Sequence, residues 1–240
     1  MNNIKKICFK SDGTEETGIK IIKALEEYGI APPKGYLELK KAIGKSYPEV
    51  SQAVLDKVKK AIDALKKDRF HEAETAYKAL VEIFPDVADL HFNLASSYYF
   101  QGKTEEALSE LKNVISIEPD AVDAYGNLGA MLYRLRKYPE AEEVLRKALK
   151  INPSLPEVRC NLGVVFKALE KYPEAEKEYR EVIRINPNDA VAHFNLGNLL
   201  KDSKRFAEAE QEYREVIRVA PNYPQVHLIL GNLLSKELKK

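Results

Sequence analysis

The sequence predicts an all-α fold, a solenoid in which pairs of helices stack on their neighbours. The first observation behind this prediction is a proline that returns every 34 residues: Pro85, Pro119, Pro153, Pro187 and Pro221. The second is an alanine twelve residues before each proline: Ala73, Ala107, Ala141, Ala175 and Ala209. A fixed period of this length is typical of repeat proteins, in which each unit packs only against the units beside it.

Other positions also recur when each unit is numbered 1 to 34 with the proline at position 32. Position 7 is Leu94, Leu128, Leu162, Leu196 and Leu230, and position 24 is Tyr77, Leu111, Leu145, Tyr179 and Tyr213. Position 8 is small: Ala61, Ala95, Gly129, Gly163, Gly197 and Gly231. This pattern resembles the tetratricopeptide repeat (TPR) family, with its L-G-x2-Y…A-x3-F…P signature. The resemblance covers about residues 54–240 and implies a right-handed solenoid of helix pairs, A followed by B.

The family's tryptophan at position 4 is the main departure from this pattern. Its place is taken by His91, Tyr125, Arg159, His193 and His227. We expect smaller or more polar side chains there to loosen the local packing.

The helical region is predicted to run over residues 48–223 as five units: 54–87, 88–121, 122–155, 156–189 and 190–223. In each unit the proline should end helix B, because it cannot continue a helix. The next residue is expected to cap the following helix A through its side-chain oxygen. These predicted caps are Asp86, Asp120, Ser154, Asn188 and Asn222.

Positions 8 and 20 hold glycine or alanine in every unit. This indicates that helices A and B cross closely there and leave little room for a larger side chain. Replacing Gly163 by leucine should therefore force the two helices apart.

Residues 1–47 and 224–240 are predicted to be helical additions at the two ends. Thr14 favours a helix start, and Gly29 favours a helix end after Tyr28. The first segment is expected to cap the solenoid, with docking to another protein as the alternative. The second reads as a helix A without a helix B. In it we expect Leu228, Ile229 and Leu230 to cover the fifth unit, while Leu233 and Leu234 suggest an apolar outer face.

Composition excludes several classes of protein. The net charge is only +1, so no global field favours nucleic acid or an anionic membrane. No apolar run approaches the roughly 18 residues of a membrane helix. The N-terminus lacks the apolar core and small-residue cleavage site of a signal peptide. Two distant cysteines, Cys8 and Cys160, favour a reducing, cytoplasmic setting without disulfides.

No catalytic motif or metal-binding spacing stands out, so we expect neither an enzyme nor a cofactor. His91, His193 and His227 share position 4, but stacked units are about 8–10 Å apart, too far for one metal ion. Packing between helices is the expected role of these histidines. Cys160 lacks an evident base and reads as a small apolar side chain.

The TPR resemblance implies that the A helices line a concave groove that holds a peptide or a partner helix. Position 6 there is a row of asparagines: Asn93, Asn127, Asn161 and Asn195. An amide both donates and accepts hydrogen bonds, which suits the backbone of an extended peptide. The alternative is that these asparagines only stabilise helix ends or solvate the groove.

Aromatic and basic residues are predicted to flank this row. They are Tyr99, Tyr133, Arg134, Lys167 and Lys201. Aromatic groups at one end and cations at the other would suit a ligand with apolar and acidic residues. The lysines and arginine of chaperone-binding TPR domains are missing from positions 2, 5 and 6, so a chaperone tail is not expected.

The sequence therefore predicts a non-catalytic protein–protein interaction scaffold with a peptide or partner segment in the groove. The alternative is a homo-oligomeric scaffold that assembles through its exposed ends.

Overall fold

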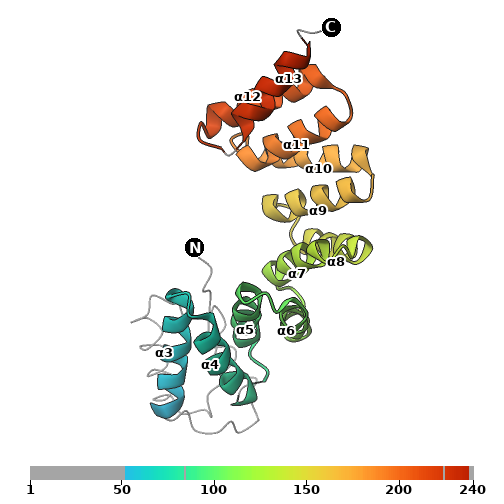
Figure 1. Ribbon diagram of the computed structural model, residues 1–240. Coiled ribbons are helices and arrows are strands. Elements are labelled where there is room, and N and C mark those ends of the chain that lie inside the picture. The colour runs from blue at the N-terminus through green and yellow to red at the C-terminus, as the bar shows by residue number, and fades with distance from the viewer. Residues whose placement is uncertain (1–51, 84, 224, 238–240) are drawn as a thin grey trace. The chain divides into compact units, whose positions relative to one another are not determined.

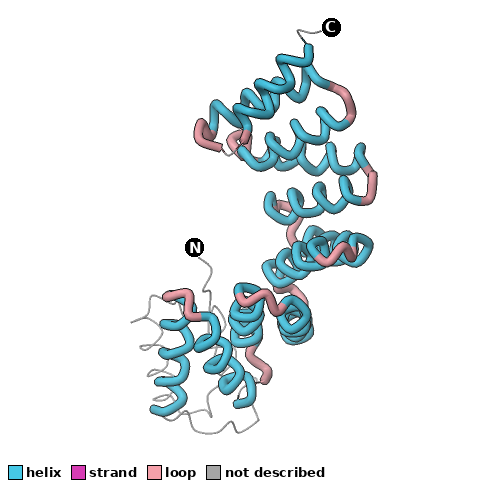
Figure 2. The backbone as a smooth tube through the Cα atoms, viewed as in Figure 1, coloured by secondary structure: helices cyan, strands magenta, loops and turns pink. Residues whose placement is uncertain are grey.

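A computed structural model describes residues 52–83, 85–223 and 225–237 (Figure 1). The described part of the chain is all-α, and its helices pack in tandem without a strand (Figure 2). The chain divides into two compact units, each larger than one 34-residue repeat. From here on, the first unit is residues 1–124 and the second unit is residues 125–240. The predicted cap over residues 1–47 lies outside the described residues.

The described part of the first unit contains four complete helices, each packed on the next in chain order. They are α3 (Gln52–Lys66), α4 (Phe70–Ile83), α5 (Ala88–Phe100) and α6 (Thr104–Ile117). Helix α7 (Val122–Arg134) begins just before the division between the units and continues into the second.

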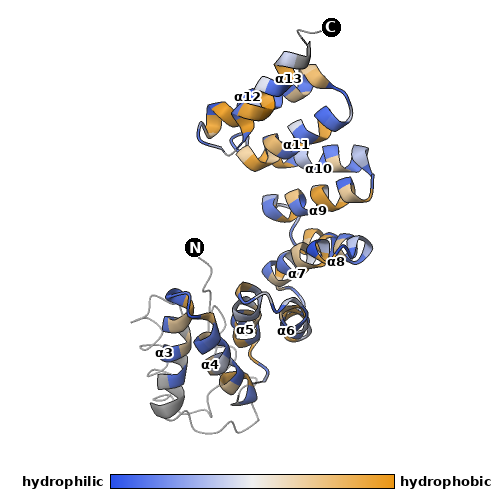
Figure 3. Ribbon diagram, viewed as in Figure 1, coloured by the Kyte–Doolittle hydropathy of each residue, from blue (hydrophilic) through white to orange (hydrophobic). Residues whose placement is uncertain are grey.

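The second unit continues the same succession of A and B helices. They are α8 (Tyr138–Ile151), α9 (Pro156–Ala168), α10 (Tyr172–Ile185), α11 (Ala190–Asp202), α12 (Phe206–Val219) and α13 (Val226–Glu237). Hydrophobic and hydrophilic residues alternate along these helices (Figure 3), as expected when one face of a helix is buried.

The A helices begin later than the sequence predicts. The N-cap residues of α5, α9 and α11 are Val87, Leu155 and Asp189, one position beyond the expected caps. Only Asp189 caps with its side chain, which accepts a hydrogen bond from the backbone N–H of Ala192 at 2.9 Å. The prediction of capping by Asp86, Ser154 and Asn188 was therefore wrong, because these residues lie in the turn that precedes the cap.

The turn from helix A to helix B has the same backbone conformation in all five repeats. Position 15 lies in the left-handed region, with φ between 54° and 75°. The residues are Asp68, Gly102, Arg136, Glu170 and Lys204. Only one of the five is glycine, although this conformation costs other residues about 1–2 kcal/mol. The tight turn places the start of helix B directly beside the end of helix A.

The close crossing of helices A and B is confirmed. A Cβ atom built on Gly163 would lie 2.5 Å from Cε1 of Tyr179, and one on Gly129 would lie 2.5 Å from Cδ2 of Leu145. Non-bonded carbon atoms essentially never lie this close together, so glycine is needed for the observed packing. The facing side chain belongs to position 24, while the position-20 alanines are fully buried.

Ion pairs join consecutive repeats at the edge of this core. Glutamate at position 21 pairs with the cation at position 16 of the next repeat. The pairs are Glu74–Lys103 at 2.6 Å, Glu142–Lys171 at 2.7 Å and Glu176–Arg205 at 2.6 Å. They lie where helix B of one repeat meets the A–B turn of the following repeat.

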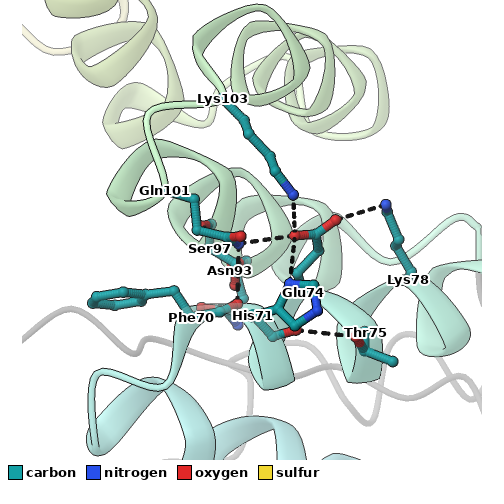
Figure 4. A network of polar contacts seen from close by, with 9 residues as sticks. All are labelled: Phe70, His71, Glu74, Thr75, Lys78, Asn93, Ser97, Gln101 and Lys103. Carbon is teal, nitrogen blue, oxygen red and sulfur yellow. Dashed lines mark hydrogen bonds and ion pairs between the residues drawn. The ribbon is translucent and has the colours of Figure 1, made fainter.

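Glu74 forms the most extensive of these networks (Figure 4). Its buried carboxylate accepts hydrogen bonds from Lys78, Gln101 and Lys103, at 2.6 to 2.9 Å. Burial alone would raise the pKa of this carboxyl group. The three donors outweigh burial and lower its pKa to about 2, so Glu74 is a charged, fully paired group within the first unit.

Candidate functional site

One stripe of residues remains accessible along each of the A helices α9 and α11. Positions 2, 6, 9 and 13 follow the i, i+4, i+7, i+11 spacing that places residues on one helix face. In the second unit these residues are Glu157, Asn161, Val164 and Ala168 on α9, and Val191, Asn195, Asn198 and Asp202 on α11. All are exposed or half-buried, whereas the positions between them are mostly buried. Because α9 and α11 are in contact, the two stripes form one accessible face.

The predicted asparagine row occupies position 6 of this stripe. Asn127 is exposed, and Asn161 and Asn195 are half-buried. Within the described chain, the side-chain amides of these three residues hydrogen-bond to no other residue. Asn93 differs, because it is only 3% exposed and its buried Nδ2 has no partner among the described residues. The accessible amides are therefore those of the second unit.

The predicted aromatic residues lie at the ends of their A helices. In the first unit, Tyr99 and Phe100 are 40% and 60% exposed. The ring of Phe100 stacks on that of Phe70, with centroids 4.6 Å apart. In the second unit, Tyr133 packs on Tyr138 at 5.5 Å. The Phe100 ring thus packs on the start of the preceding helix B, α4, whereas the Tyr133 ring packs on the start of the following helix B, α8. Both rings keep part of their surface accessible.

The predicted cations differ in what they contact. Lys167 forms an ion pair with Asp202 at 2.7 Å, which links the ends of α9 and α11. Lys201 is half-buried, and among the described residues it forms no ion pair. Arg134 is exposed at the end of α7 and has an interaction within the chain. Lys201 is therefore the cation with its charge least compensated by the protein.

The sequence did not single out Val191, Asn198 and Asp202, which share the face with the predicted residues. Val191 is 48% exposed. The Oδ1 of Asn198 accepts a hydrogen bond from the buried hydroxyl of Tyr213 at 2.9 Å, which fixes its amide. The spacing of position 6 with positions 2, 9 and 13 was the signal that could have identified them.

Position 4 forms a polar clamp rather than loosened packing. His193 donates from Nδ1 to the Glu212 carboxylate at 2.6 Å and from Nε2 to the Pro187 carbonyl at 3.1 Å. His91 makes the same two bonds, to Glu110 and to the Pro85 carbonyl. Both partners can only accept hydrogen bonds, so each ring must donate from both nitrogens and is charged.

The pKa values agree with this geometry. The Glu212 carboxylate raises the pKa of His193 above its usual range and outweighs the opposing effect of burial. At His91 burial is the largest influence and lowers the pKa, but Glu110 and the Pro85 carbonyl together raise it. Arg159 makes the equivalent contacts with Glu178 and the Pro153 carbonyl. The predicted role of these histidines in helix packing is thus carried out by hydrogen bonds and charge.

Groups that could perform chemistry are scarce in the described part of the chain. No three His, Cys, Asp or Glu residues there come together as a metal site. Cys160 is buried against Val182 and Ala192, and burial raises the pKa of its thiol to about 12. A thiol in that state is a poor nucleophile. None of the described helices combines the length and the apolar character needed to cross a membrane.

Family comparison decides the identity of the fold. Two profiles of the tetratricopeptide repeat match the chain, one over residues 58–111 and 93–156 and the other over 166–233. The chain belongs to the tetratricopeptide-repeat family. No curated protein matches this TPR chain in sequence.

Solved structures of other TPR proteins share the fold at low sequence identity. Pseudomonas aeruginosa PilF is 23% identical, with a TM-score of 0.67 over 78% of this chain and 85% of PilF. MamA from Desulfovibrio magneticus RS-1 is 15% identical, with a TM-score of 0.67 over 73% of this chain and 99% of the MamA chain. YrrB, described as a TPR protein with an unusual peptide-binding site, is 18% identical, with a TM-score of 0.60 over 70% of this chain and 87% of the YrrB chain.

Proposed function

We propose that this TPR protein is a non-catalytic interaction scaffold that binds an extended peptide segment of a partner along its A helices. The observation that carries the proposal is the row of accessible amides at Asn127, Asn161 and Asn195, which hydrogen-bond to no other described residue. TPR proteins generally bind protein or peptide partners, and the peptide-binding site of YrrB supports the same role here.

Hydrogen bonds to the ligand backbone account for the asparagines. An extended peptide presents backbone N–H and C=O groups at regular intervals, and each amide can donate to one and accept from the other. Repeating the same amide on successive A helices repeats that contact along the ligand. Such contacts set the position of the peptide but do not select its side chains.

Side-chain selection is assigned to the flanking residues. The proposed peptide-binding set is Asn93, Asn127, Asn161, Asn195, Tyr99, Tyr133, Arg134, Lys167 and Lys201. Within this set, Lys201 is the cation proposed to receive an acidic group, because Lys167 is already paired with Asp202. The half-buried Tyr133 offers an aromatic surface in the same unit as Lys201. A ligand with apolar and acidic residues would satisfy both features.

The proposal is tested by selecting ligands from a displayed library of random peptides on the wild-type protein. The affinity of a selected peptide is then measured for Asn127→Ala/Asn161→Ala by fluorescence anisotropy. We expect weakening by about tenfold or more, since each lost hydrogen bond contributes roughly 0.5–1.5 kcal/mol. The exposed Asn222, which lies in a turn away from the stripe, provides the matched Asn222→Ala control. Equal affinity for all three proteins would refute the proposed site.

The proposed setting is the cytoplasm. The unpaired thiol of Cys160 is compatible with a reducing compartment. The net charge of +1 supports a protein partner rather than a nucleic acid.

A second candidate function is assembly of the protein with itself, and the surface of α13 favours it. Leu228 is 66% exposed. It therefore does not cover the fifth repeat as the sequence suggested, whereas Leu233, only 5% exposed, does pack inward. An increase in sedimentation coefficient with protein concentration would support assembly, and a constant monomer would exclude it.

A further inference from the structure

Helix α13 has the features that receive a helix B in the other repeats. Gly231 stands at position 8, where Gly163 and Gly197 lie under the rings of Tyr179 and Tyr213. Among the described residues, no atom lies within 4 Å of a Cβ built on Gly231. The place that a large side chain fills in repeats 3, 4 and 5 is therefore open on α13.

His227 identifies the chemistry of the missing helix. In repeats 2, 4 and 5, a histidine or arginine at position 4 pairs with a glutamate at position 23: His91–Glu110, Arg159–Glu178 and His193–Glu212. Repeats 1 and 3 have neither a histidine or arginine at position 4 nor a glutamate at position 23. Position 4 and position 23 thus change together within this chain.

On α13 only half of this clamp is made. His227 donates from Nε2 to the Pro221 carbonyl at 2.8 Å, as the other two histidines do with their prolines. Its Nδ1 has no partner among the described residues. A helix that completes the clamp would have to bring a carboxylate to that nitrogen and a large side chain to Gly231.

The required pattern is Ala-x-x-Glu-Tyr, and it occurs three times in the sequence. Two occurrences, Ala175–Tyr179 and Ala209–Tyr213, are the helices B of repeats 4 and 5. The third is Ala24–Tyr28, with the sequence ALEEY. It lies outside the described residues, in the segment 14–28 that the sequence predicts to be helical. Ala24, Glu27 and Tyr28 thus have the spacing of Ala209, Glu212 and Tyr213, although they lie outside the repeat register.

We propose that residues 14–28 of one copy dock as a helix B on α13 of a second copy, with Glu27 at His227 and Tyr28 over Gly231. This inference rests on the second candidate function and specifies its surface. The exposed Leu228 would be covered by the docked helix, since it holds the position of Cys160, which packs against helix B through Val182.

A second copy is the occupant because the two surfaces lie at opposite ends of the repeat array in sequence. In the sequence of one chain, the five repeats of residues 54–223 lie between residues 14–28 and α13. Contact between copies requires no closure of that long segment, and it leaves the same two surfaces free at the ends of the pair. The resulting association is head-to-tail and can continue beyond a dimer.

The test uses the full chain in sedimentation velocity runs between about 1 and 300 µM, a range that brackets micromolar association. Gly231→Leu fills the open place on α13, which has room for the added side chain. Tyr28→Ala removes the anchor on the other surface. Gln211→Ala, on the exposed side of α12, is the control. Circular dichroism and thermal melting of each variant verify folding.

We expect the wild type and Gln211→Ala to associate with rising concentration. Each of the other two variants should associate about tenfold or more weakly, as when an aromatic anchor is lost from an interface. An equimolar mixture of Gly231→Leu and Tyr28→Ala should regain a mixed dimer, because each supplies the surface that the other lacks.

Three results would overturn the inference. A wild type that stays monomeric throughout would exclude self-association. If either variant associated as strongly as the wild type, the interface would lie elsewhere. If the mixture associated no more strongly than each variant alone, a head-to-tail contact would be excluded. These results are independent of the asparagine face, because Gly231→Leu leaves every residue of that face unchanged and should bind the selected peptides normally.

Discussion

The ring of Tyr179 lies so close to Gly163 that a Cβ atom on the glycine would be only 2.5 Å from Cε1. Replacing Gly163 by leucine should therefore separate α9 from α10 and destabilise the protein by a few kcal/mol, about 1–3 or more for an overpacked core. The matched variant is Gly231→Leu at the same repeat position, where space is open. Thermal unfolding should show a lower Tm for the first variant only, and equal Tm values would contradict the packing account.

The stability of the protein should respond differently when the hydroxyl groups of two buried tyrosines at position 24 are removed. The hydroxyl of Tyr77 is buried without a hydrogen-bond partner among the described residues. Tyr77→Phe should leave stability unchanged or raise it by about 1 kcal/mol, since an unpaired buried polar group is unfavourable. Tyr213→Phe loses the bond to Asn198 and should cost about 1 kcal/mol. Urea unfolding of both variants measures this, and a loss at Tyr77 as large as that at Tyr213 would argue against the difference.

Glu74 should make stability depend on pH in the acid range. Its pKa is lowered from 4.5 to about 2 in the folded protein. A lowered carboxyl pKa contributes stability above pH 4.5, and this stability is lost as the pH falls from there toward 2. Glu74→Gln should destabilise the protein at neutral pH by about 2–3 kcal/mol.

The same variant should flatten the stability profile between pH 5 and 2.5, as measured by urea unfolding at each pH. Glu72, which is exposed and pairs with the partly exposed Arg69, provides a control in Glu72→Gln. A wild-type profile retained by Glu74→Gln would show that Glu74 is not the group responsible.

The histidine clamps predict a dependence of the opposite sign near neutrality. The pKa values of His91 and His193 are raised above 6.5 by their carboxylate and carbonyl partners. Their contribution is complete below pH 6.5 and is lost as the pH rises through the raised values. His91→Gln/His193→Gln should remove this loss and lower stability at pH 6 by about 1–2 kcal/mol for each histidine.

Urea unfolding from pH 5.5 to 9 measures this effect, with His71→Gln as the control because the His71 side chain is 85% exposed. Were the double variant to keep the wild-type slope in this range, the clamps could not be the source of the pH dependence.

Much of the fold could be predicted from the sequence because the residues that make each contact recur at the same position in several repeats. Glycine at position 8 of repeats 3, 4 and 5 indicated a close helix crossing, and Gly163 confirms it. The partner in that crossing, Tyr179, was not predicted, because periodicity shows which positions are small but not which side chain fills the space. The left-handed turn at position 15 was equally hidden, since only Gly102 has the residue type that signals it.

The ends of the array were harder to predict for a different physical reason. A helix without its usual partner has the sequence of a buried helix, so Leu228 and Leu233 look alike. Only the contact of α12 with α13 separates the buried Leu233 from the exposed Leu228. The same limit applies to the asparagine row, because burial of Asn93 depends on its neighbours and not on its repeat position.

The most direct test of the proposed function is to observe the side-chain amides by NMR while a selected peptide is added to the isotopically labelled protein. We expect the Nδ2 resonances of Asn127, Asn161 and Asn195 to shift in proportion to the bound fraction. The resonance of Asn222, in an exposed turn off the stripe, should stay in place. If the three resonances remain unchanged at saturation while others move, the ligand binds elsewhere and the central claim is contradicted.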